Sequence, residues 1–146
     1  MNAASRVLVI KLEGMGEFVQ ALAAARAIRE HHVGARITLL TTDAFREIAQ
    51  KCPYFDMVEA DGKPRDAQAT AQLIARIRAA KYDIIYDLEN SSRTNTYFQG
   101  LRPWPPNWCG VAQGCSHHVT EAERAPLHAL DQYALQLSAA GVEVPQ

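Results

Sequence analysis

The sequence lacks the signatures of several common classes of protein. No Gly-Lys-Ser or Gly-Lys-Thr occurs in its 146 residues, which excludes a P-loop nucleotide site. The three cysteines form no Cys-x-x-Cys pair, so we expect reduced, mostly buried thiols and not a zinc site or a disulfide scaffold. A net charge of −1 gives no general attraction to nucleic acid, and no apolar run approaches membrane-spanning length. The composition predicts one ordinary domain over residues 1–146, cytoplasmic and large enough to bury a core.

Apolar runs alternate with helical patterns along the chain. We expect helices at 18–28, 43–51, 66–80, 90–100 and 126–140, and strands at 7–10, 36–41, 56–59, 83–88 and near Trp108. The strand runs are apolar throughout, which is typical of parallel strands covered on both faces. The predicted fold class is therefore α/β, with a Rossmann-like, doubly wound and mostly parallel sheet.

The turn between the first strand and the first helix is the strongest candidate site. It reads Lys11-Leu-Glu-Gly-Met-Gly-Glu-Phe18 and falls at the carboxyl edge of the sheet, where open α/β folds bind ligands. Gly14 and Gly16 let the backbone bend or approach a ligand, but Val19 replaces the third glycine of a dinucleotide fingerprint. Glu17 has two interpretations: a functional carboxylate, or one that only complements the helix dipole.

Two further turns carry polar side chains. Asn90, Ser91, Ser92 and Arg93 follow the fourth strand, and the arginine fork suits a phosphate or a carboxylate; the alternative is a helix cap beside a solvated arginine. His117 and His118 follow the fifth strand, but adjacent histidines rarely face one metal ion, so no metal site is expected. His31 and His32, at the end of the first helix, are expected to meet the helix dipole.

In their order and spacing, these segments resemble the N-terminal half of the ADP-heptose:lipopolysaccharide heptosyltransferases. The resemblance spans nearly the whole chain, although no single motif is specific. The segments that carry it are Val7–Lys11, Gly14–Leu22, Ala27–Glu30, Ala35–Leu40, Pro53–Asp56, Tyr82–Leu88, Ser91–Arg93 and Leu127–Leu137.

The resemblance implies one half of a GT-B architecture, the arrangement of two facing Rossmann-like domains. This chain would be the acceptor-binding domain of an inverting, cofactor-free and metal-independent glycosyltransferase. The nucleotide-sugar donor, ADP-heptose or similar, would bind a C-terminal domain absent from this chain, and the acceptor would be a phosphorylated lipopolysaccharide core saccharide. Glu17 occupies the position of the family's acidic general base. The acceptor-binding residues implied are Lys11, Gly14, Met15, Gly16, Asn90, Ser91, Ser92, Arg93 and His117.

Two residues depart from that family's pattern. Glu17 carries its carboxylate about one bond farther out than the family's aspartate, and Glu13 stands where the family usually has a small residue. If these two carboxylates lie close together, each raises the pKa of the other.

Three functions remain open. The chain is an acceptor domain, from a fragment or a split enzyme, that is inactive by itself; or a stand-alone carbohydrate- or protein-binding module; or an unrelated Rossmann-like enzyme. For the first, we expect Phe18 and Trp104 to expose apolar surface at the carboxyl edge and to drive homo-oligomer formation. We also expect a cytoplasmic protein that lies peripherally at the inner membrane.

Overall fold

The structure is built on a six-stranded parallel sheet. This computed structural model describes residues 5–13 and 15–144, and the side chains of residues 15–18 lie outside the description. The strand order is β3-β2-β1-β4-β5-β6, and every neighbouring pair is parallel. The strands are β1 (Arg6–Ile10), β2 (Arg36–Leu40), β3 (Met57–Glu59), β4 (Ile84–Asp87), β5 (Asn107–Gly110) and β6 (His117–His118). The predicted α/β, Rossmann-like class is confirmed.

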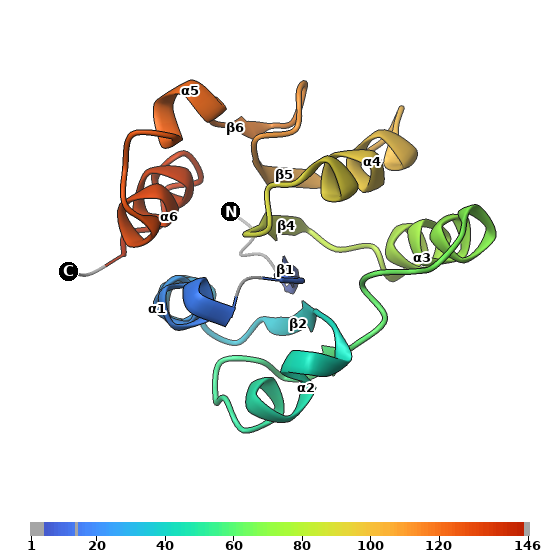
Figure 1. Cartoon of the computed structure of the whole chain (residues 1–146), viewed down its shortest axis with the longest axis horizontal. Coiled ribbons are helices and arrows are strands. Elements are labelled where there is room, and N and C mark those ends of the chain that lie inside the picture. Colours follow the sequence, from blue (N-terminus) through green and yellow to red (C-terminus); the bar gives the residue numbers. More distant parts are fainter. Residues whose placement is uncertain (1–4, 14, 145–146) are drawn as a thin grey trace.

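Helices cover both faces of the sheet. They are α1 (Met15–His31), α2 (Asp43–Gln50), α3 (Ala67–Ala80), α4 (Ser92–Leu101), α5 (Glu121–Arg124) and α6 (Ala129–Ser138). Figure 1 shows α1 and α6 on one side of the strands and α3 and α4 on the other. Because both faces are covered, successive residues of one strand enter different cores: Val7 and Val9 pack on the α1 side, and Leu8 and Ile10 on the α3 and α4 side.

Local signals set several helix ends. Asp66 caps α3 by accepting a hydrogen bond from the Ala69 N–H at 2.7 Å, and Lys81 ends that helix in the left-handed conformation, with a φ of 53°. Ser91 begins α4 through a capping box with Thr94. The α4 helix therefore begins one residue after Ser91, and Asn90 lies outside it with a φ of 51°.

The C-terminal part of the chain differs from the prediction. We expected one helix over 126–140, but the structure has the short α5 and then α6, which begins at Ala129. Thr120 and Glu123 form a capping box that begins α5, a signal that we did not use. Leu127, within the predicted helix, instead lies in the connection between α5 and α6 and is exposed. The two-residue β6 is too short to have a sequence pattern.

Trp104 does not lie where we expected it. It is in the connection between α4 and β5, and connections that lead from a helix into a parallel strand lie at the amino edge of the sheet. Its side chain is 88% exposed, so the prediction of exposure is confirmed and the prediction of the carboxyl edge is wrong. Phe18 is among the residues whose side chains are not described.

His32 also differs from its prediction. Its Nε2 lies 2.6 Å from the Tyr86 hydroxyl in the core between α1 and β4. Burial, assisted by the charges of His31 and Arg29, lowers the pKa of His32 to about 4. His32 is therefore neutral near pH 7 and does not act as a cation at the helix end, whereas His31 does lie in the last turn of α1.

Candidate functional site

The two candidate turns meet at the switch point of the sheet. The β1 and β4 strands are neighbours, Ile10 pairs with Asp87, and the chain order reverses between these strands. The Leu88 N–H donates to the Ile10 carbonyl at 2.9 Å, which carries the pairing one residue beyond β4. Ligands of doubly wound folds bind at this crevice, so topology supports the location predicted from the sequence.

Glu89 fastens the second turn to the first. Its Oε1 accepts hydrogen bonds from the Leu12 N–H at 2.8 Å and the Glu13 N–H at 3.1 Å. The same oxygen lies 3.4 Å from the Lys11 Nζ, and both side chains are more than nine-tenths buried. The ammonium group of Lys11 therefore forms a buried ion pair with Glu89, the residue that accepts the hydrogen bonds of the first turn.

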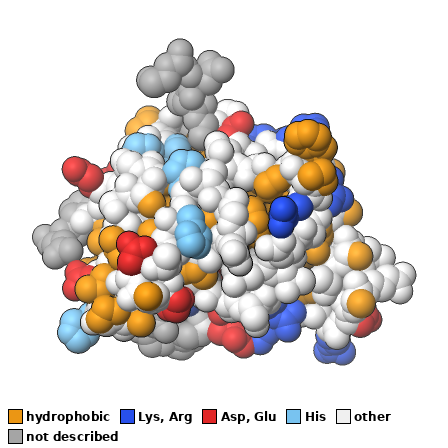
Figure 2. All heavy atoms as spheres, turned by 90° about the horizontal axis from the view of Figure 1, so that it is seen from above, with side chains coloured by type: hydrophobic (Ala, Val, Ile, Leu, Met, Phe, Trp, Pro, Cys, Tyr) orange, Lys and Arg blue, Asp and Glu red, His pale blue; other side chains and the backbone are white. Residues whose placement is uncertain are grey.

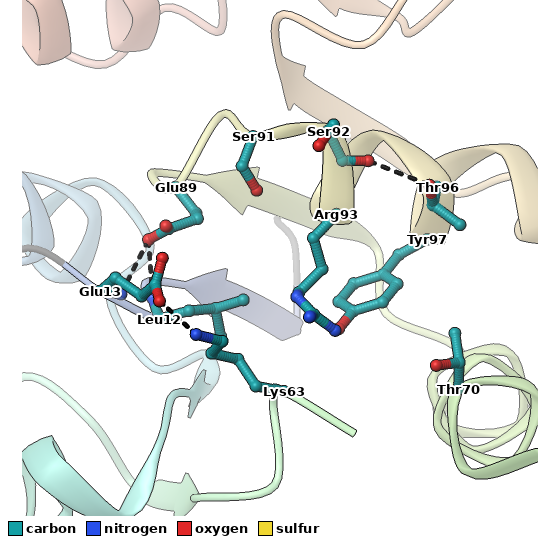
Figure 3. Close-up of a pocket in the computed structure, with 10 residues that line it drawn as sticks. All are labelled: Leu12, Glu13, Lys63, Thr70, Glu89, Ser91, Ser92, Arg93, Thr96 and Tyr97. Carbon is teal, nitrogen blue, oxygen red and sulfur yellow. Dashed lines mark hydrogen bonds and ion pairs between the residues drawn. The ribbon is translucent and has the colours of Figure 1, made fainter. Parts of the chain in front are cut away.

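A cavity of about 460 Å³ opens beside these turns. Figure 3 shows Lys63 and Arg93 extending into it from opposite sides, with Glu13 and Glu89 at one end and the Tyr97 ring beside Arg93. Its ten lining residues come from the first turn, the loop after β3, α3, the turn after β4 and α4: Leu12, Glu13, Lys63, Thr70, Glu89, Ser91, Ser92, Arg93, Thr96 and Tyr97. We call this cavity the switch-point pocket.

The loop that carries Lys63 is held in place by close packing and ion pairs. A Cβ added to Gly62 would lie 2.4 Å from the Leu12 Cδ2 and 2.7 Å from the Thr41 carbonyl oxygen, so only glycine fits there. The Tyr97 hydroxyl donates to the Gly62 carbonyl at 2.6 Å. Arg76 forms a bidentate ion pair with Asp61, with hydrogen bonds of 2.6 and 2.7 Å, and these hydrogen bonds lower the pKa of Asp61.

Glu13 is paired with a cation in this structure. Its carboxylate forms a hydrogen-bonded ion pair with Lys63, and that contact lowers the pKa of Glu13; the charges of Arg93 and Lys11 act in the same direction. The predicted effect of Glu17 on Glu13 stays a prediction, because the side chain of Glu17 lies outside the description. An exposed pair of this kind contributes little to stability and can open when a competing anion arrives.

Ser91, Ser92 and Arg93 line the pocket, whereas Asn90 does not, and the part of these residues in acceptor binding stays a prediction. The Ser91 hydroxyl is used as the cap of α4, and Ser92 is exposed on the first turn of that helix. Asn90 donates from Nδ2 to the Gln136 side chain at 2.7 Å and accepts from the Val111 N–H at 3.3 Å, so its amide binds α6 and the β5 side of the fold.

His117 is not among the residues that line the pocket. It lies on β6, two strands away from β4, and its Nδ1 is 2.8 Å from the Ser116 hydroxyl. Gly14 lies outside the described residues, as do the side chains of Met15 and Glu17. The helix α1 begins at Met15, so the backbone of Gly16 and Glu17 lies in its first turn. Their roles stay predictions.

The pocket offers groups suited to an anionic, hydroxyl-rich ligand. Arg93 supplies a planar fork and Lys63 a point charge, while Thr70, Thr96, Ser92 and Tyr97 bring hydroxyl groups to its walls. Within residues 5–13 and 15–144, no three His, Cys, Asp or Glu residues gather closely enough to hold a metal ion. In the same ranges, no helix is long and apolar enough to cross a membrane.

Sequence reasoning missed three residues of the site. Lys63 lies between the strand predicted at 56–59 and the helix predicted at 66–80, and only the close packing of Gly62 beside it brings it to the site. Glu89 lay between predicted site residues without a role, and Tyr97 lay within a predicted helix. A carboxylate one residue before a helix-capping segment is not by itself a signal, so only the fold reveals the hydrogen bonds of Glu89 to the first turn.

Comparison with known proteins gives a limited match in sequence. No protein-family model matches the chain. A Haemophilus influenzae protein named "Putative glycosyltransferase" is 28% identical over 78 residues, which are 53% of this chain and 22% of that protein.

Solved structures give a fuller match. A glycosyl transferase family 9 structure from Veillonella parvula superimposes with a TM-score of 0.76 at 21% identity, over 94% of this chain and 42% of that one. The E. coli heptosyltransferase WaaC, with ADP-2-deoxy-2-fluoro heptose, gives 0.67 at 18% identity, over 97% and 50%. E. coli ADP-heptose lps heptosyltransferase II gives 0.69 at 16%, over 96% and 44%. The chain spans about half the length of these solved structures. The resemblance found in the sequence is thus confirmed, because the chain has the fold of one half of solved heptosyltransferases.

Proposed function

We propose that this chain is the acceptor-binding domain of an inverting, metal-independent glycosyltransferase that acts on a lipopolysaccharide core saccharide. The observation that carries the proposal is the switch-point pocket, with Arg93 and Lys63 facing one space in a heptosyltransferase-like fold. A nucleotide-sugar, ADP-heptose or a close relative, would come from a donor-binding half outside this chain. The complete enzyme would work in the cytoplasm, peripherally at the inner membrane.

The pocket would bind the anionic part of the acceptor. A phosphate or carboxylate between Arg93 and Lys63 gains charge-assisted hydrogen bonds, which are roughly twice as strong as neutral ones. The hydroxyl groups of Ser92, Thr96 and Thr70 would bind sugar hydroxyls around that anchor. Glu89 would keep the first turn at a fixed position relative to α4, so that the acceptor meets the helix α1 in one orientation.

Glu17 would act as the general base. It lies in the first turn of α1, next to the glycine turn that Glu89 holds. Its carboxylate would take the proton of the acceptor hydroxyl as that oxygen forms a bond to the anomeric carbon of the donor. The bond from that carbon to the nucleoside diphosphate would break at the same time, and the diphosphate would leave with the electron pair.

Calorimetry with a phosphorylated core oligosaccharide tests the binding site. Arg93→Ala should weaken binding by about 1.5–3 kcal/mol through loss of charge-assisted hydrogen bonds. Arg93→Lys keeps the charge and should recover part of the affinity, and Arg26→Ala, which removes an exposed arginine of α1, should change nothing. The dephosphorylated oligosaccharide should bind wild type and Arg93→Ala alike. Equal affinity of both proteins for the phosphorylated form would exclude Arg93 from the site.

Transfer itself is tested after fusion of this chain to the donor-binding half of a solved heptosyltransferase. Glu17→Gln should lower kcat by about 10²–10⁴-fold with acceptor affinity nearly unchanged, and Glu17→Asp should retain activity. Glu13→Gln is the matched control and should cost far less. Turnover of Glu17→Gln at the wild-type rate contradicts the role of Glu17, as does failure of that variant to fold. Acceptor binding without any transfer would favour the stand-alone binding module.

A further inference from the structure

The connection between α4 and β5 carries one large exposed apolar side chain among its described residues, that of Trp104. The ring is 88% exposed at a position with no connection to the switch-point pocket. Its neighbours Pro103, Pro105 and Pro106 restrict the backbone, because each proline fixes one dihedral angle. A chain restricted in this way loses little entropy when it holds a tryptophan outward. The proline-rich loop therefore holds the Trp104 side chain outward, where its apolar ring can contact another molecule.

A groove of about 560 Å³ lies beside this loop. Its apolar wall is formed by Ile77 of α3, Leu101 of α4, Tyr82 and the proline loop. Arg78, Lys81 and Arg102 are exposed along the same groove, and its lining, as described, contains no acidic residue. Figure 2 shows one face of the molecule, on which hydrophobic side chains lie directly beside Lys and Arg side chains near the upper right.

The positive charge continues along the amino edge of the sheet. Arg6 and Arg36 begin β1 and β2 at this edge, and both are exposed. Two exposed acids lie at the same edge, Asp83 just before β4 and Asp56 just before β3. Asp83 accepts hydrogen bonds from the Ser5 and Arg6 N–H groups at 2.8 and 2.9 Å, and Asp56 forms an ion pair with Arg29 at 3.0 Å. The excess of positive charge is therefore greatest beside the groove, where Arg78, Lys81 and Arg102 have no acidic residue among the lining residues.

Two further apolar side chains project from the same edge. Val33, in the connection from α1 to β2, is 82% exposed, and Met57, at the start of β3, is 42% exposed. From β3 to β5 the edge crosses four strand intervals of about 4.8 Å, or roughly 19 Å. Exposed apolar side chains set among cations are complementary to a surface that is anionic at its face and apolar beneath.

We propose that the amino edge of the sheet, with Trp104 as its main apolar anchor, docks on the surface of an anionic phospholipid bilayer. Tryptophan rings prefer the level of the lipid headgroups, where the apolar ring and the indole N–H are both accommodated. Lysine and arginine next to such a ring add attraction to anionic lipid that falls off within a Debye length. The surface lies opposite the switch-point pocket, so the two can succeed or fail independently.

Vesicle binding by the full chain tests the proposal. Unilamellar vesicles of phosphatidylcholine alone and of phosphatidylcholine with phosphatidylglycerol at 3:1 are the two probes, and flotation gives the partition coefficient. We expect binding to the anionic vesicles only, and weaker binding in 1 M salt, where the Debye length is about 3 Å. Trp108, the other tryptophan, is fully buried, so a blue shift of the emission and protection from iodide report on Trp104.

Substitutions at exposed positions should separate docking from folding. Trp104→Ala should reduce partitioning about five- to tenfold, because the apolar anchor is lost. Lys81→Asn removes one charge and should cost about fivefold; asparagine tolerates the left-handed backbone at this position. Val19→Ala, on α1 and 71% exposed, and Arg65→Gln, exposed in the connection from β3 to α3 at the carboxyl edge, are the matched controls and should partition like wild type.

Several outcomes would overturn the docking surface. These are equal partitioning of wild type and Trp104→Ala, equal binding to neutral and anionic vesicles, or no binding to either. Sedimentation of the same samples without lipid adds another: a dimer that Trp104→Ala dissolves would assign the edge to a second copy of the chain. Binding of poly-glutamate that depends on Trp104, with no binding of vesicles, would assign it to an acidic protein partner.

Discussion

Asp87 is predicted to make the folded chain less stable at neutral pH than at acidic pH. Its side chain is completely buried at the end of β4, and one oxygen, Oδ1, accepts hydrogen bonds from the Glu89 and Asn90 N–H groups at 3.1 and 2.9 Å. The other oxygen, Oδ2, has no hydrogen-bond partner among the described residues. Burial, assisted by the charge of Glu89, raises the pKa of Asp87 from 3.8 to about 6.

The sign and size of the effect follow from this pKa. Because the folded chain holds the proton more tightly than the unfolded chain, stability is highest below about pH 4 and falls as the pH rises to about 6. A tenfold change in proton affinity is worth about 1.4 kcal/mol, so the full loss is on the order of 3 kcal/mol. Asp87→Asn keeps an Oδ1 acceptor for both N–H groups and cannot ionise. It should match wild type near pH 4 and exceed its stability by up to about 3 kcal/mol at pH 8.

Urea unfolding followed by circular dichroism, at pH 4, 5, 6, 7 and 8, measures this difference. His32 titrates in the same range with the opposite sign, because its pKa is lowered and stability is lost as the pH falls from 6.5 to about 4. Subtracting the two profiles removes the histidine, which both proteins share. A constant difference across the range, or an Asp87→Asn protein that is less stable at pH 8, would refute a raised pKa of the buried Asp87 carboxyl group.

Two other substitutions test how the site is held. Gln136→Met keeps the volume of a fully buried side chain but removes its hydrogen bonds to the Asp87 and Cys109 carbonyls, at 2.6 and 3.0 Å, and to Asn90. We expect urea unfolding to show a free energy of unfolding lowered by about 1.5–4 kcal/mol, and a decrease below about 0.5 kcal/mol would contradict the network. Gly62→Ala places a Cβ against Leu12 and the Thr41 carbonyl. We therefore expect the free energy of unfolding to fall by about 1–3 kcal/mol, and the phosphorylated oligosaccharide to bind more weakly. An unchanged unfolding curve and unchanged calorimetry would show that the loop shifts at no cost.

Much of the fold could be predicted because its strands are fully buried. Val7–Ile10 and Ile84–Tyr86 are apolar on both faces, so their runs stand out from the amphipathic helices around them. The C-terminal part was less predictable: α5 has four residues and β6 has two, and such short elements exist only through their tertiary contacts. Trp104 was placed at the wrong edge because its exposure was considered without the direction of the chain through the sheet.

The candidate site was predictable to the extent that topology decides it. Polar residues after β1 and β4 had to meet, because parallel neighbours end at one edge, and the Ser91–Arg93 segment does lie on the pocket with Glu13. Lys63 and Tyr97 could not be assigned, since their positions depend on a loop that packs through Gly62. Asn90 was predicted by sequence adjacency alone, whereas the left-handed backbone at this residue turns its side chain toward α6.

Gln136 gives the helix α6 a mechanical role. One side chain joins α6 to the ends of β4 and β5 and to the turn that precedes α4. Hydrogen bonds of this length stretch by only a few tenths of an ångström before they weaken, so this joint is stiffer than an apolar contact that can slide. A pull or a rotation applied to α6 is therefore passed to the Asn90 turn, and from there to the Arg93 side of the pocket. A displacement of α6 is therefore expected to displace the Asn90 turn, and a displacement of that turn to displace α6.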